Sequence, residues 1–473
     1  MDPLERLASL RREHNPALRN FFVPGEPVYV ASAPGRLDVM GGIADYSGSL
    51  VLQLPLDRQT TAMLQLQQEP NLDVVSLRDG EPFYASIGLD AFLHSPECAP
   101  EKLAAFFVTD PSSHWASYVF GVAHACLVRN ASRMREATGG FRMLIQSDVP
   151  EGKGVSSSAA LEVSSLAAIA AAYGGDLSAE EIARAAQWAE NHVALAPCGI
   201  MDQMTSACGL RDHLLRLRCQ PAKIEGQVAI PEGYRFYGID SGIRHTVSGG
   251  DYVTVRTASF MGYRMIAEMS GLAVERAGSR VAVQDDRWRG YLAEIPPHLF
   301  ARQFEHALPE HMLGADFLAQ YHGITDRVTT VNPERSYPVR VATAHPIHEN
   351  ARVGVFAELL NSLAGDSTIA AELGRLMRAS HESYSACGLG SDGTDRLVSM
   401  VAEAGEKQGL YGAKITGGGS GGTVAILGTI AAESAVREIA DRYETETGMR
   451  GEVFAGSGAG MAQRGVLVGS TDW

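Results

Sequence analysis

The sequence contains few cysteines, fewer basic than acidic residues and no long apolar run. The six cysteines form no CxxC pair and no His/Cys pattern typical of a metal site, so we expect reduced thiols in a cytoplasmic protein. Lysine and arginine number 40 against 55 aspartates and glutamates, and the formal net charge is -15. The protein therefore has no electrostatic reason to bind nucleic acid or an anionic membrane, although local donors can still hold a small anion.

Hydrophobic runs are short. The longest, near residues 166–172, is interrupted on its N-terminal side by serines and is far below the roughly 20 residues that a membrane-spanning helix needs. Residues 1–6 are charged and lead into an amphipathic stretch without the apolar core of a signal peptide. We therefore expect neither a secretory leader nor a membrane partner.

The length and composition are those of a globular protein with more than one core. A chain of 473 residues exceeds what one hydrophobic core usually holds, so we expect two domains. The content of 45% hydrophobic and 20% charged residues is ordinary for such proteins. The sequence leaves the choice between a monomer and a homodimer open.

A glycine- and serine-rich stretch at residues 149–160 is typical of a phosphate-binding loop. It lies between an expected strand at residues 140–147 and an Ala/Leu-rich helix at residues 161–172. The first turn of a helix offers unpaired N–H groups and a positive dipole end, and three serine hydroxyls add donors or metal ligands. The alternative is that glycine and serine only cap the helix. No G-x-x-x-x-G-K-[ST] string is present, which disfavours a P-loop ATPase or GTPase.

A second glycine-rich segment, residues 34–48, is expected to form a turn between strands at residues 28–33 and 50–54. It carries one arginine, Arg36, and two aspartates. Charged side chains held by such a turn are well placed to face a ligand.

Two acidic residues flank a turn that contains proline. Ser178 and Glu181 form an expected capping box for a helix that runs to Glu190, and the apolar pattern resumes around Asp202. Without further context, the odds are about even that Glu190 is a solvated surface acid. They are also about even that Asp202 is a helix N-cap.

Two aromatic residues lie at the start of another expected helix. Trp115 and Tyr118 are three positions apart, so they share one face of that helix. Without further context, aromatic pairs at this spacing belong to a hydrophobic core more often than to a nucleobase site.

The second half of the chain has fewer signals. We expect a strand and a domain crossover near residues 234–246, and a third glycine-rich turn at residues 413–422 before a strand. A G-x-S-x-G string at residues 418–422 matches a hydrolase elbow, but an elbow needs a strand before it and a helix after it. Residues 285–350 are rich in His, Pro and Arg, and the sequence assigns them no function. Helices are expected over residues 1–22, 251–272, 351–380 and 392–405.

Together, the three glycine-rich segments resemble the signature motifs of the GHMP small-molecule kinases. The string Pro-Cys-Gly-Ile-Met-Asp-Gln at residues 197–203 resembles one carried by the galactokinase branch. The resemblance implies an α+β, two-domain fold. Its parts would be a ribosomal protein S5 domain 2-like domain over residues 1–235 and a ferredoxin-like domain over residues 236–473, with an insertion around residues 285–350. It also implies ATP and Mg²⁺ as cofactors.

The same resemblance implies roles for single residues. Asp202 would accept the proton of the sugar hydroxyl, and Arg36 beside it would favour the ionised carboxylate. Ser158 and Glu190 would hold Mg²⁺, since oxygen ligands suit that ion. The remaining implied roles are phosphate contacts by Gly152, Gly154, Ser156 and Ser157, adenine contacts by Trp115 and Tyr118, and sugar contacts by Ile43, Asp45, Gly199 and Tyr252.

One difference from the family bears on the substrate. Galactokinases have G-E-H-T-D-Y-N-G where this chain has G-G-I-A-D-Y-S-G at residues 41–48, so Gly42 and Ile43 replace a Glu and a His while Asp45 is kept. In the family the Glu and His lie near the C6 hydroxymethyl group of the sugar. L-arabinopyranose has the galactose ring configuration without that group, and polar side chains left unpaired in a buried pocket are costly. The exchange therefore fits a pentose.

Residues 36–46 and 383–393 are similar to the kinase portion of plant L-arabinokinases. We therefore predict ATP-dependent phosphorylation of an anomeric hydroxyl, with L-arabinose as the first candidate. The alternatives are a galactokinase and a non-catalytic galactokinase-like sensor of sugar and ATP. The retained Arg36 and Asp202 argue against the sensor, and a uronic acid is less favoured because no cation replaces the lost Glu and His.

Overall fold

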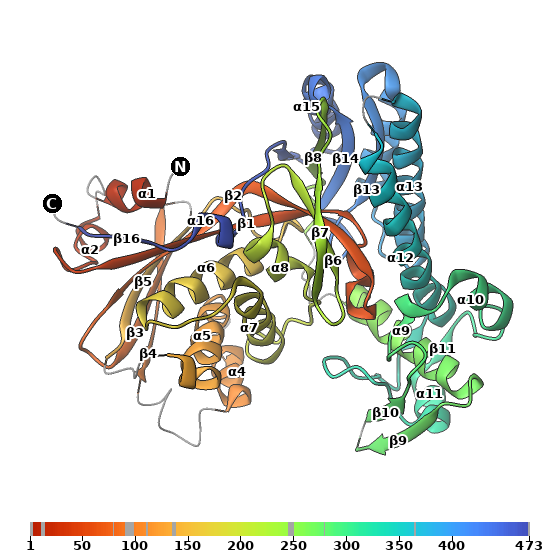
Figure 1. Ribbon diagram of the computed structural model, residues 1–473, viewed down its shortest axis with the longest axis horizontal. Coiled ribbons are helices and arrows are strands. Elements are labelled where there is room, and N and C mark those ends of the chain that lie inside the picture. Colours follow the sequence, from red (N-terminus) through yellow and green to blue (C-terminus); the bar gives the residue numbers. More distant parts are fainter. Residues whose placement is uncertain are drawn as a thin grey trace.

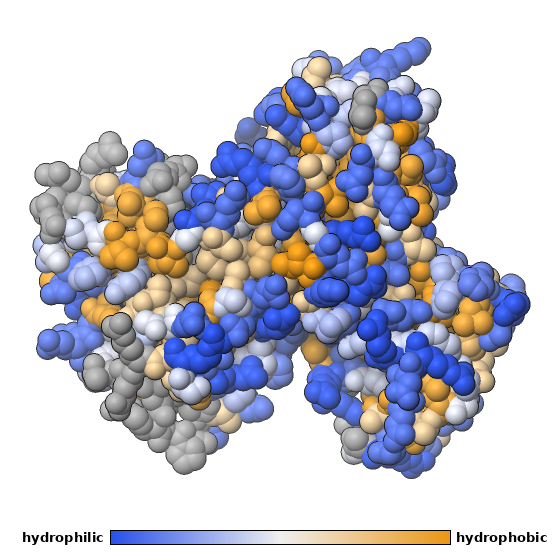
Figure 2. All heavy atoms as spheres, in the orientation of Figure 1, coloured by the Kyte–Doolittle hydropathy of each residue, from blue (hydrophilic) through white to orange (hydrophobic). Residues whose placement is uncertain are grey.

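The computed structural model describes residues 3–10, 15–78, 80–89, 99–109, 112–134, 139–244, 250–278, 280–363 and 366–471. Figure 1 shows two parts joined by the long strands β1 and β2. The larger sheet lies on the left with helices α4 to α8 below it, and a smaller sheet lies on the right beside the long helices α12 and α13. In Figure 2 this face is mostly hydrophilic, and it is indented between the lobe that carries α4 to α7 and the lobe that carries α9 to α11.

The larger sheet has eight strands, in the order β16-β1-β2-β5-β3-β4, and β6 and β7 extend it from β2. β2 is 17 residues long, so its second half pairs with β5 while its first four residues pair with β6. The strands are β1 (Val28–Met40), β2 (Leu50–Leu66), β3 (Asn71–Arg78), β4 (Glu81–Gly88), β5 (Phe141–Ser147), β6 (His213–Arg218), β7 (Lys223–Ala229) and β16 (Leu467–Gly469).

β1 is longer than the sequence predicted. The turn expected at residues 34–48 is confined to the end of that segment, because β1 continues with register shifts before Arg36 and after Asp38. Such bulges let a strand continue past a proline, which cannot donate to the ladder. A Cβ on Gly35 would lie 2.6 Å from the carbonyl oxygen of Val155, so only glycine allows this close approach. Arg36 and Asp38 therefore project from a strand and not from a loop.

Helices cover one face of the larger sheet. α6 packs against β1 and β2 and also contacts its neighbours α5, α7 and α8, which agrees with its Ala/Leu-rich sequence. α7 begins at the predicted capping box, in which the N–H of Glu181 donates to Ser178 Oγ and the N–H of Ser178 donates to the Glu181 carboxylate. The helices are α4 (Pro100–Thr109), α5 (Ala116–His124), α6 (Ser157–Ala172), α7 (Ala179–His192) and α8 (Met201–Cys208).

The smaller sheet has the strand order β13-β14-β8-β15. It contains β8 (Tyr234–Asp240), β13 (Leu410–Ile415), β14 (Thr423–Thr429) and β15 (Val453–Phe454), and it packs against α13 (Ser367–Ala386), α14 (Asp392–Ala404) and α15 (Glu433–Thr447). The helical region expected at residues 351–380 is two helices. α12 (Val339–Asn361) begins earlier than expected, and Asp366 caps α13 through the N–H of Thr368.

The segment without a predicted function folds into short elements around α9 (Gly250–Met269) and α12. They are η5 (Leu292–Glu294), α10 (Pro297–Gln303), β11 (Met312–Leu313), α11 (Gly314–Tyr321) and β12 (Ser336–Tyr337), and the antiparallel pair of β9 (Ala273–Ala277) and β10 (Arg280–Gln284) comes just before the segment. Elements this short explain the weak periodicity of the sequence. Their buried aromatic residues share one hydrophobic cluster with Ile43 and Tyr46 of the first glycine-rich segment. This region therefore supports that segment from behind.

Both ends of the described chain lie on the larger sheet. The single helix expected over residues 1–22 is two short helices, α1 (Pro3–Ser9) and α2 (Pro16–Arg19), and residues 11–14 between them lie outside the described residues. β16 pairs with β1, so the C-terminal segment returns to the first sheet (Figure 1). The short α16 (Met461–Arg464) precedes it. The predicted α+β class is confirmed, whereas the division at residue 235 stays a prediction.

Among the helices of the described residues, none is both long enough and apolar enough to cross a membrane.

Candidate active site

The loop that joins β5 to α6 (residues 148–156, the β5–α6 loop) contains three left-handed residues. φ is 69° at Gly152, 71° at Gly154 and 59° at Ser156. Ser156 is the N-cap residue of α6, yet its side chain makes no cap hydrogen bond. Its hydroxyl donates to Oδ2 of Asp202 at 2.6 Å instead. The alternative that this loop merely caps a helix is therefore wrong for Ser156, and the two serines that follow it line a cavity.

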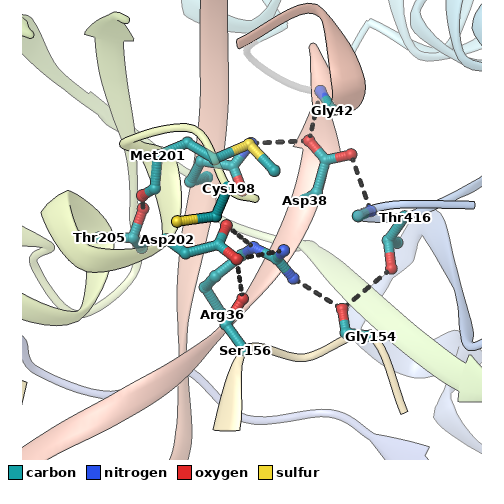
Figure 3. Close-up of polar contacts among 12 residues, drawn as sticks. Arg36, Asp38, Gly42, Gly154, Ser156, Cys198, Met201, Asp202, Thr205 and Thr416 are labelled. Carbon is teal, nitrogen blue, oxygen red and sulfur yellow. Dashed lines mark hydrogen bonds and ion pairs between the residues drawn. The ribbon is translucent and has the colours of Figure 1, made fainter. Parts of the chain in front are cut away.

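Arg36 of β1 and Asp202 of α8 form a two-point ion pair, shown in Figure 3. Nε of Arg36 lies 2.9 Å from Oδ1 of Asp202, and Nη2 lies 3.0 Å from Oδ2. The third guanidinium nitrogen donates to the carbonyl oxygen of Gly154 at 2.6 Å. Since the N-cap of α8 is Ile200, Asp202 lies in the first turn and the N-cap alternative is wrong. Its side chain is 22% exposed against 4% for Arg36, so the carboxylate faces the cavity with the arginine behind it.

Several carboxyl groups are crowded into the same region. Burial and the charge of Asp202 raise the pKa of Asp45 to about 7. Burial and Asp202 also raise the pKa of Glu190 to about 7, and burial and Glu190 hold the pKa of Glu162 well above its ordinary value. The side-chain amide of Gln203 donates to both glutamates. Glu190 is therefore a buried residue, and the interpretation of it as a surface acid is wrong.

This excess of acid fits a bound cation. Ser158 is among the groups that lower the pKa of Glu190, and both residues line the cavity, so a hydroxyl and a carboxylate stand together at the cavity wall. Oxygen ligands of this kind suit Mg²⁺. Among the described residues no group of three His, Cys, Asp or Glu side chains is arranged to hold a metal ion, so phosphate oxygens and water would have to complete the coordination.

The opposite wall of the cavity comes from the short 3-10 helix η2 (Gly42–Ser47, the η2 loop), from α9 and from the turn before α8. Ile43 and Asp45 of that loop line the cavity together with Gly199 and Tyr252. A Cβ on Gly199 would lie 1.6 Å from Oδ2 of Asp45, so the glycine leaves room for the carboxylate. The ring of Tyr252 contacts the ring of Tyr46 edge to face, with centroids 6.0 Å apart. The wall therefore combines an apolar side chain, a carboxyl group and a tyrosine.

The third glycine-rich turn, residues 417–422, closes the cavity from the smaller sheet. A Cβ on Gly422 would lie 3.1 Å from the carbonyl oxygen of Lys153, and Thr423 Oγ1 donates to that oxygen at 2.7 Å. The turn therefore acts through the close approach of its backbone to the β5–α6 loop. β13 precedes it and β14 follows it, so Ser420 does not lie on a strand-to-helix elbow.

Lys153 points away from the cavity. Its Nζ lies 2.8 Å from the Glu452 carboxylate and 3.2 Å from that of Asp240. Asp240 is the last residue of β8, and Glu452 directly precedes β15. These ion pairs therefore connect the β5–α6 loop to the smaller sheet.

A groove continues from the cavity along α5. It is lined by Trp115 and Tyr118, and it shares Gly152, Ser158 and Glu190 with the first cavity. The Trp115 side chain packs with the Arg78 guanidinium 5.5 Å from its ring. A flat ligand beside these aromatic rings could thus extend its far end to the β5–α6 loop.

The structure brings the predicted site residues together. Every residue predicted for catalysis, phosphate, metal or sugar lines the first cavity, and the two predicted for adenine line the adjoining groove. Sequence reasoning missed Glu162, Lys414 and Tyr384, which are buried behind the cavity. Glu162 lies four positions after Ser158 on α6, and that spacing places both on one helix face. No comparable local signal marks the other two.

The chain matches three family descriptions. It matches "Galactokinase galactose-binding signature" over residues 19–66, "GHMP kinases N terminal domain" over residues 117–210 and "GHMP kinases C terminal" over residues 368–445. Together these matches include the η2 loop, the β5–α6 loop and Asp202.

Curated relatives agree with the matches. L-arabinokinase of Arabidopsis thaliana is 41% identical over 93% of this chain, and the match covers 47% of that protein, so this chain spans about half of its length. Galactokinase of Chloroflexus aggregans is 30% identical over 89% of this chain and 90% of that protein.

Solved structures share the fold. Galactokinase of Lactococcus lactis complexed with galactose superimposes with a TM-score of 0.72 at 20% identity, covering 96% of this chain and 99% of that one. Mevalonate kinase of Methanococcus jannaschii gives a TM-score of 0.55 at 15% identity, covering 90% and 97%. The expected GHMP kinase fold is thereby confirmed. The chain belongs to the galactokinase branch of the GHMP kinase family.

Proposed function

We propose that this protein transfers the γ-phosphoryl group of ATP to the anomeric hydroxyl of a galactose-configured monosaccharide, with L-arabinose as the preferred acceptor. The observation that carries the proposal is the position of Asp202. Its carboxylate stands between the β5–α6 loop, through Ser156, and the wall formed by Ile43 and Asp45. An acceptor on that wall and a nucleotide on that loop would meet at this carboxylate.

In the reaction Asp202 accepts the proton of the sugar hydroxyl as the sugar oxygen bonds to the γ-phosphorus. The bond from that phosphorus to the β,γ-bridging oxygen breaks, and ADP leaves. Arg36 holds the Asp202 carboxylate at two points and carries a positive charge beside the transferring group. Because phosphoryl transfer has a loose transition state, this positioning and charge contribute more than the strength of the base.

The nucleotide would lie along the groove that joins the two cavities. The adenine would stack near Trp115 and Tyr118, and its phosphates would reach the β5–α6 loop at Gly152 and Gly154, which border that path. The N-terminus of α6 favours negative charge there, and Ser156 and Ser157 add hydroxyl donors.

Ser158 and Glu190 would hold Mg²⁺. When bound, the ion neutralises charge on the phosphates and so favours transfer. Glu190 has a raised pKa because of burial and Asp202, and a divalent cation would offset the carboxylate charges that cause this.

The sugar would bind against the η2 loop. Asp45 would accept hydrogen bonds from ring hydroxyls, Gly199 leaves the space for it, and Tyr252 would border the ring. Ile43 makes the adjoining wall apolar. A sugar without a hydroxymethyl group at that point leaves no hydroxyl unpaired, which favours a pentose.

The second candidate function is a galactokinase. The match to the galactose-binding signature over residues 19–66 and the galactokinase relatives favour it. The similarity to L-arabinokinase of Arabidopsis thaliana and the apolar Ile43 favour L-arabinose.

The test is a coupled ADP-release screen with L-arabinose, D-galactose, D-galacturonate and D-glucuronate. We expect the highest kcat/KM with L-arabinose, and a higher value with D-galactose would refute the preference. Asp202→Asn should lower kcat by about 10²- to 10⁴-fold while ATP still binds. The exposed Asp212→Asn is the matched control and should retain full activity. Turnover of Asp202→Asn at the wild-type rate would refute the role of the base.

A further inference from the structure

Tyr384 on α13 is fully buried and does not line the cavity, but its hydroxyl contacts two walls of it. The N–H of Ile43 donates to Tyr384 Oη at 2.8 Å, and this hydroxyl donates in turn to the carbonyl oxygen of Gly417 at 3.1 Å. Ile43 belongs to the η2 loop and Gly417 to the third glycine-rich turn. One hydroxyl thus connects the two walls from behind.

The same hydroxyl occupies the space next to Gly42. φ at Gly42 is 43°, in the left-handed region. A Cβ there would lie 1.4 Å from Tyr384 Oη, 2.6 Å from Tyr384 Cζ and 2.8 Å from Asp38 Oδ2. Since bonded geometry prevents the loop from retreating far, any side chain at position 42 would have to displace the tyrosine.

The N-terminal end of the η2 loop, including its N-cap residue Gly41, is also held by hydrogen bonds. The N–H of Gly41 donates to Glu349 of α12, and the N–H of Gly42 donates to Asp38 of β1. Asp38 also accepts the N–H of Gly417 at 3.4 Å. The loop therefore takes its position from surrounding side chains, and Tyr384 lies at the point where it meets the third turn.

Tyr384 stays protonated at ordinary pH. Burial and the nearby Asp38 carboxylate raise the pKa of its hydroxyl well above the usual value. A neutral hydroxyl can donate and accept at once, which both of its contacts require. The ring is fixed as well, with the Lys414 ammonium 5.2 Å from its centroid and the His345 ring packed edge to face.

We infer that Tyr384 is a positioning residue for the sugar pocket, and that glycine is required at position 42 because the Tyr384 hydroxyl takes the place of its side chain. The inference rests on the proposed function only in taking this cavity as the sugar site. Positions 42 and 384 must therefore change together when the pocket accommodates a different sugar. Gly42→Glu with Ile43→His would by itself disrupt the pocket, and it would need a smaller residue at position 384.

The first experiment measures this steric dependence without any substrate. Gly42→Ala should lower the melting temperature by about 5 °C or more, because the new Cβ overpacks a filled site. Tyr384→Leu removes Cζ and Oη and keeps an apolar side chain, so the loss caused by Gly42→Ala should be smaller in that background. Gly48→Ala is the matched control, since Gly48 is a left-handed glycine of the same segment whose Cβ would meet Tyr291. Gly48→Ala should lower the melting temperature by the same amount in the wild type and in the Tyr384→Leu variant.

The second experiment separates positioning from stability. Tyr384→Phe leaves the Ile43 N–H and the Gly417 carbonyl without their partner, so KM for the sugar should rise about tenfold or more. KM for ATP should change less than threefold. Tyr237→Phe is the control, because that buried tyrosine donates to Thr429 far from the cavity walls and should change neither constant.

The outcomes distinguish this inference from the proposed function. If the wild-type protein phosphorylates no sugar, the proposed function fails while the melting experiment still decides on the pairing of positions 42 and 384. If the losses from Gly42→Ala and Tyr384→Leu simply add, the inference is overturned. It is also overturned if Tyr384→Phe raises the KM for the sugar and the KM for ATP equally, or if it changes neither KM, as expected for Tyr237→Phe.

Discussion

The ion pair of Lys414 with Asp38 offers the sharpest test of how the site is held together. Lys414 Nζ lies 2.8 Å from Asp38 Oδ2, and both side chains are 0% exposed. Asp38 also accepts hydrogen bonds from Gln53 Nε2 at 2.6 Å and from the N–H of Gly42 at 3.1 Å. Replacing Lys414 by methionine keeps the volume of the side chain but leaves a buried carboxylate without its cation.

The expected magnitude follows from burial. Breaking a fully buried ion pair by removing one partner costs about 3–5 kcal/mol, because the remaining charge has no water to solvate it. Removing both charges is far less costly, so Asp38→Asn with Lys414→Met should recover at least about 1.5 kcal/mol of that loss. Gln53 and Gly42 can still donate to the amide oxygen of the new asparagine.

The loss of unfolding free energy caused by Lys414→Met should also depend on pH. Burial alone would raise the pKa of Asp38, but Lys414 and Arg36 outweigh it and hold the pKa below its ordinary value. That lowered pKa contributes stability above the unfolded-state pKa, and the contribution is lost as the pH falls through the folded-state pKa. Without Lys414, burial outweighs the remaining groups that lower this pKa, so the deficit of Lys414→Met relative to the wild type should grow as the pH rises above the unfolded-state pKa of about 4.

The assay is denaturation by urea, followed by tryptophan fluorescence and circular dichroism at several pH values. The exposed Lys407→Met is the matched control and should change the free energy of unfolding by less than about 0.5 kcal/mol. A loss below about 1 kcal/mol for Lys414→Met, or a double variant as unstable as the sum of both single variants, would refute the reasoning.

Four further predictions concern Asp45, Gly199 and Trp115. Burial and Asp202 raise the pKa of Asp45 to about 7. An ionised carboxylate accepts sugar hydroxyls better, so KM for the sugar should fall from about pH 6 to pH 8 in steady-state assays, and Asp45→Asn should remove this dependence. The folded protein keeps a proton on Asp45 that the unfolded chain releases, so stability without sugar should fall as pH rises from about 4 to 7, and less so in Asp45→Asn. Gly199→Ala places a Cβ 1.6 Å from Asp45 Oδ2 and should raise the sugar Kd at least about tenfold in calorimetric titrations while the ATP Kd is unchanged. Trp115→Ala should raise the ATP Kd about tenfold and leave the sugar Kd unchanged, and equal effects on both ligands would contradict the groove assignment.

Much of the site was predictable because its residues lie in short local motifs. The β5–α6 loop is indicated by its own glycines and serines, whereas the roles of Glu190 and Asp202 were implied only by the resemblance of their motifs to those of galactokinases. Local geometry sets such features, so the strand, the helix and the loop between them agree with the structure. The β1 strand was the main error, because a glycine and a proline predict a turn locally, whereas pairing with β2 keeps the segment extended.

What the sequence determined by itself was therefore the set of motifs, their order along the chain and the loss of two polar residues at positions 42 and 43. What only the tertiary structure decided was how these motifs face one another: the hydroxyl of Tyr384 in place of a side chain at Gly42, and Lys414 paired with Asp38. Those contacts join residues more than 300 positions apart in the chain, as the separation of 376 between Lys414 and Asp38 shows. No local pattern encodes them, because they depend on the packing of one sheet and its helices against the other.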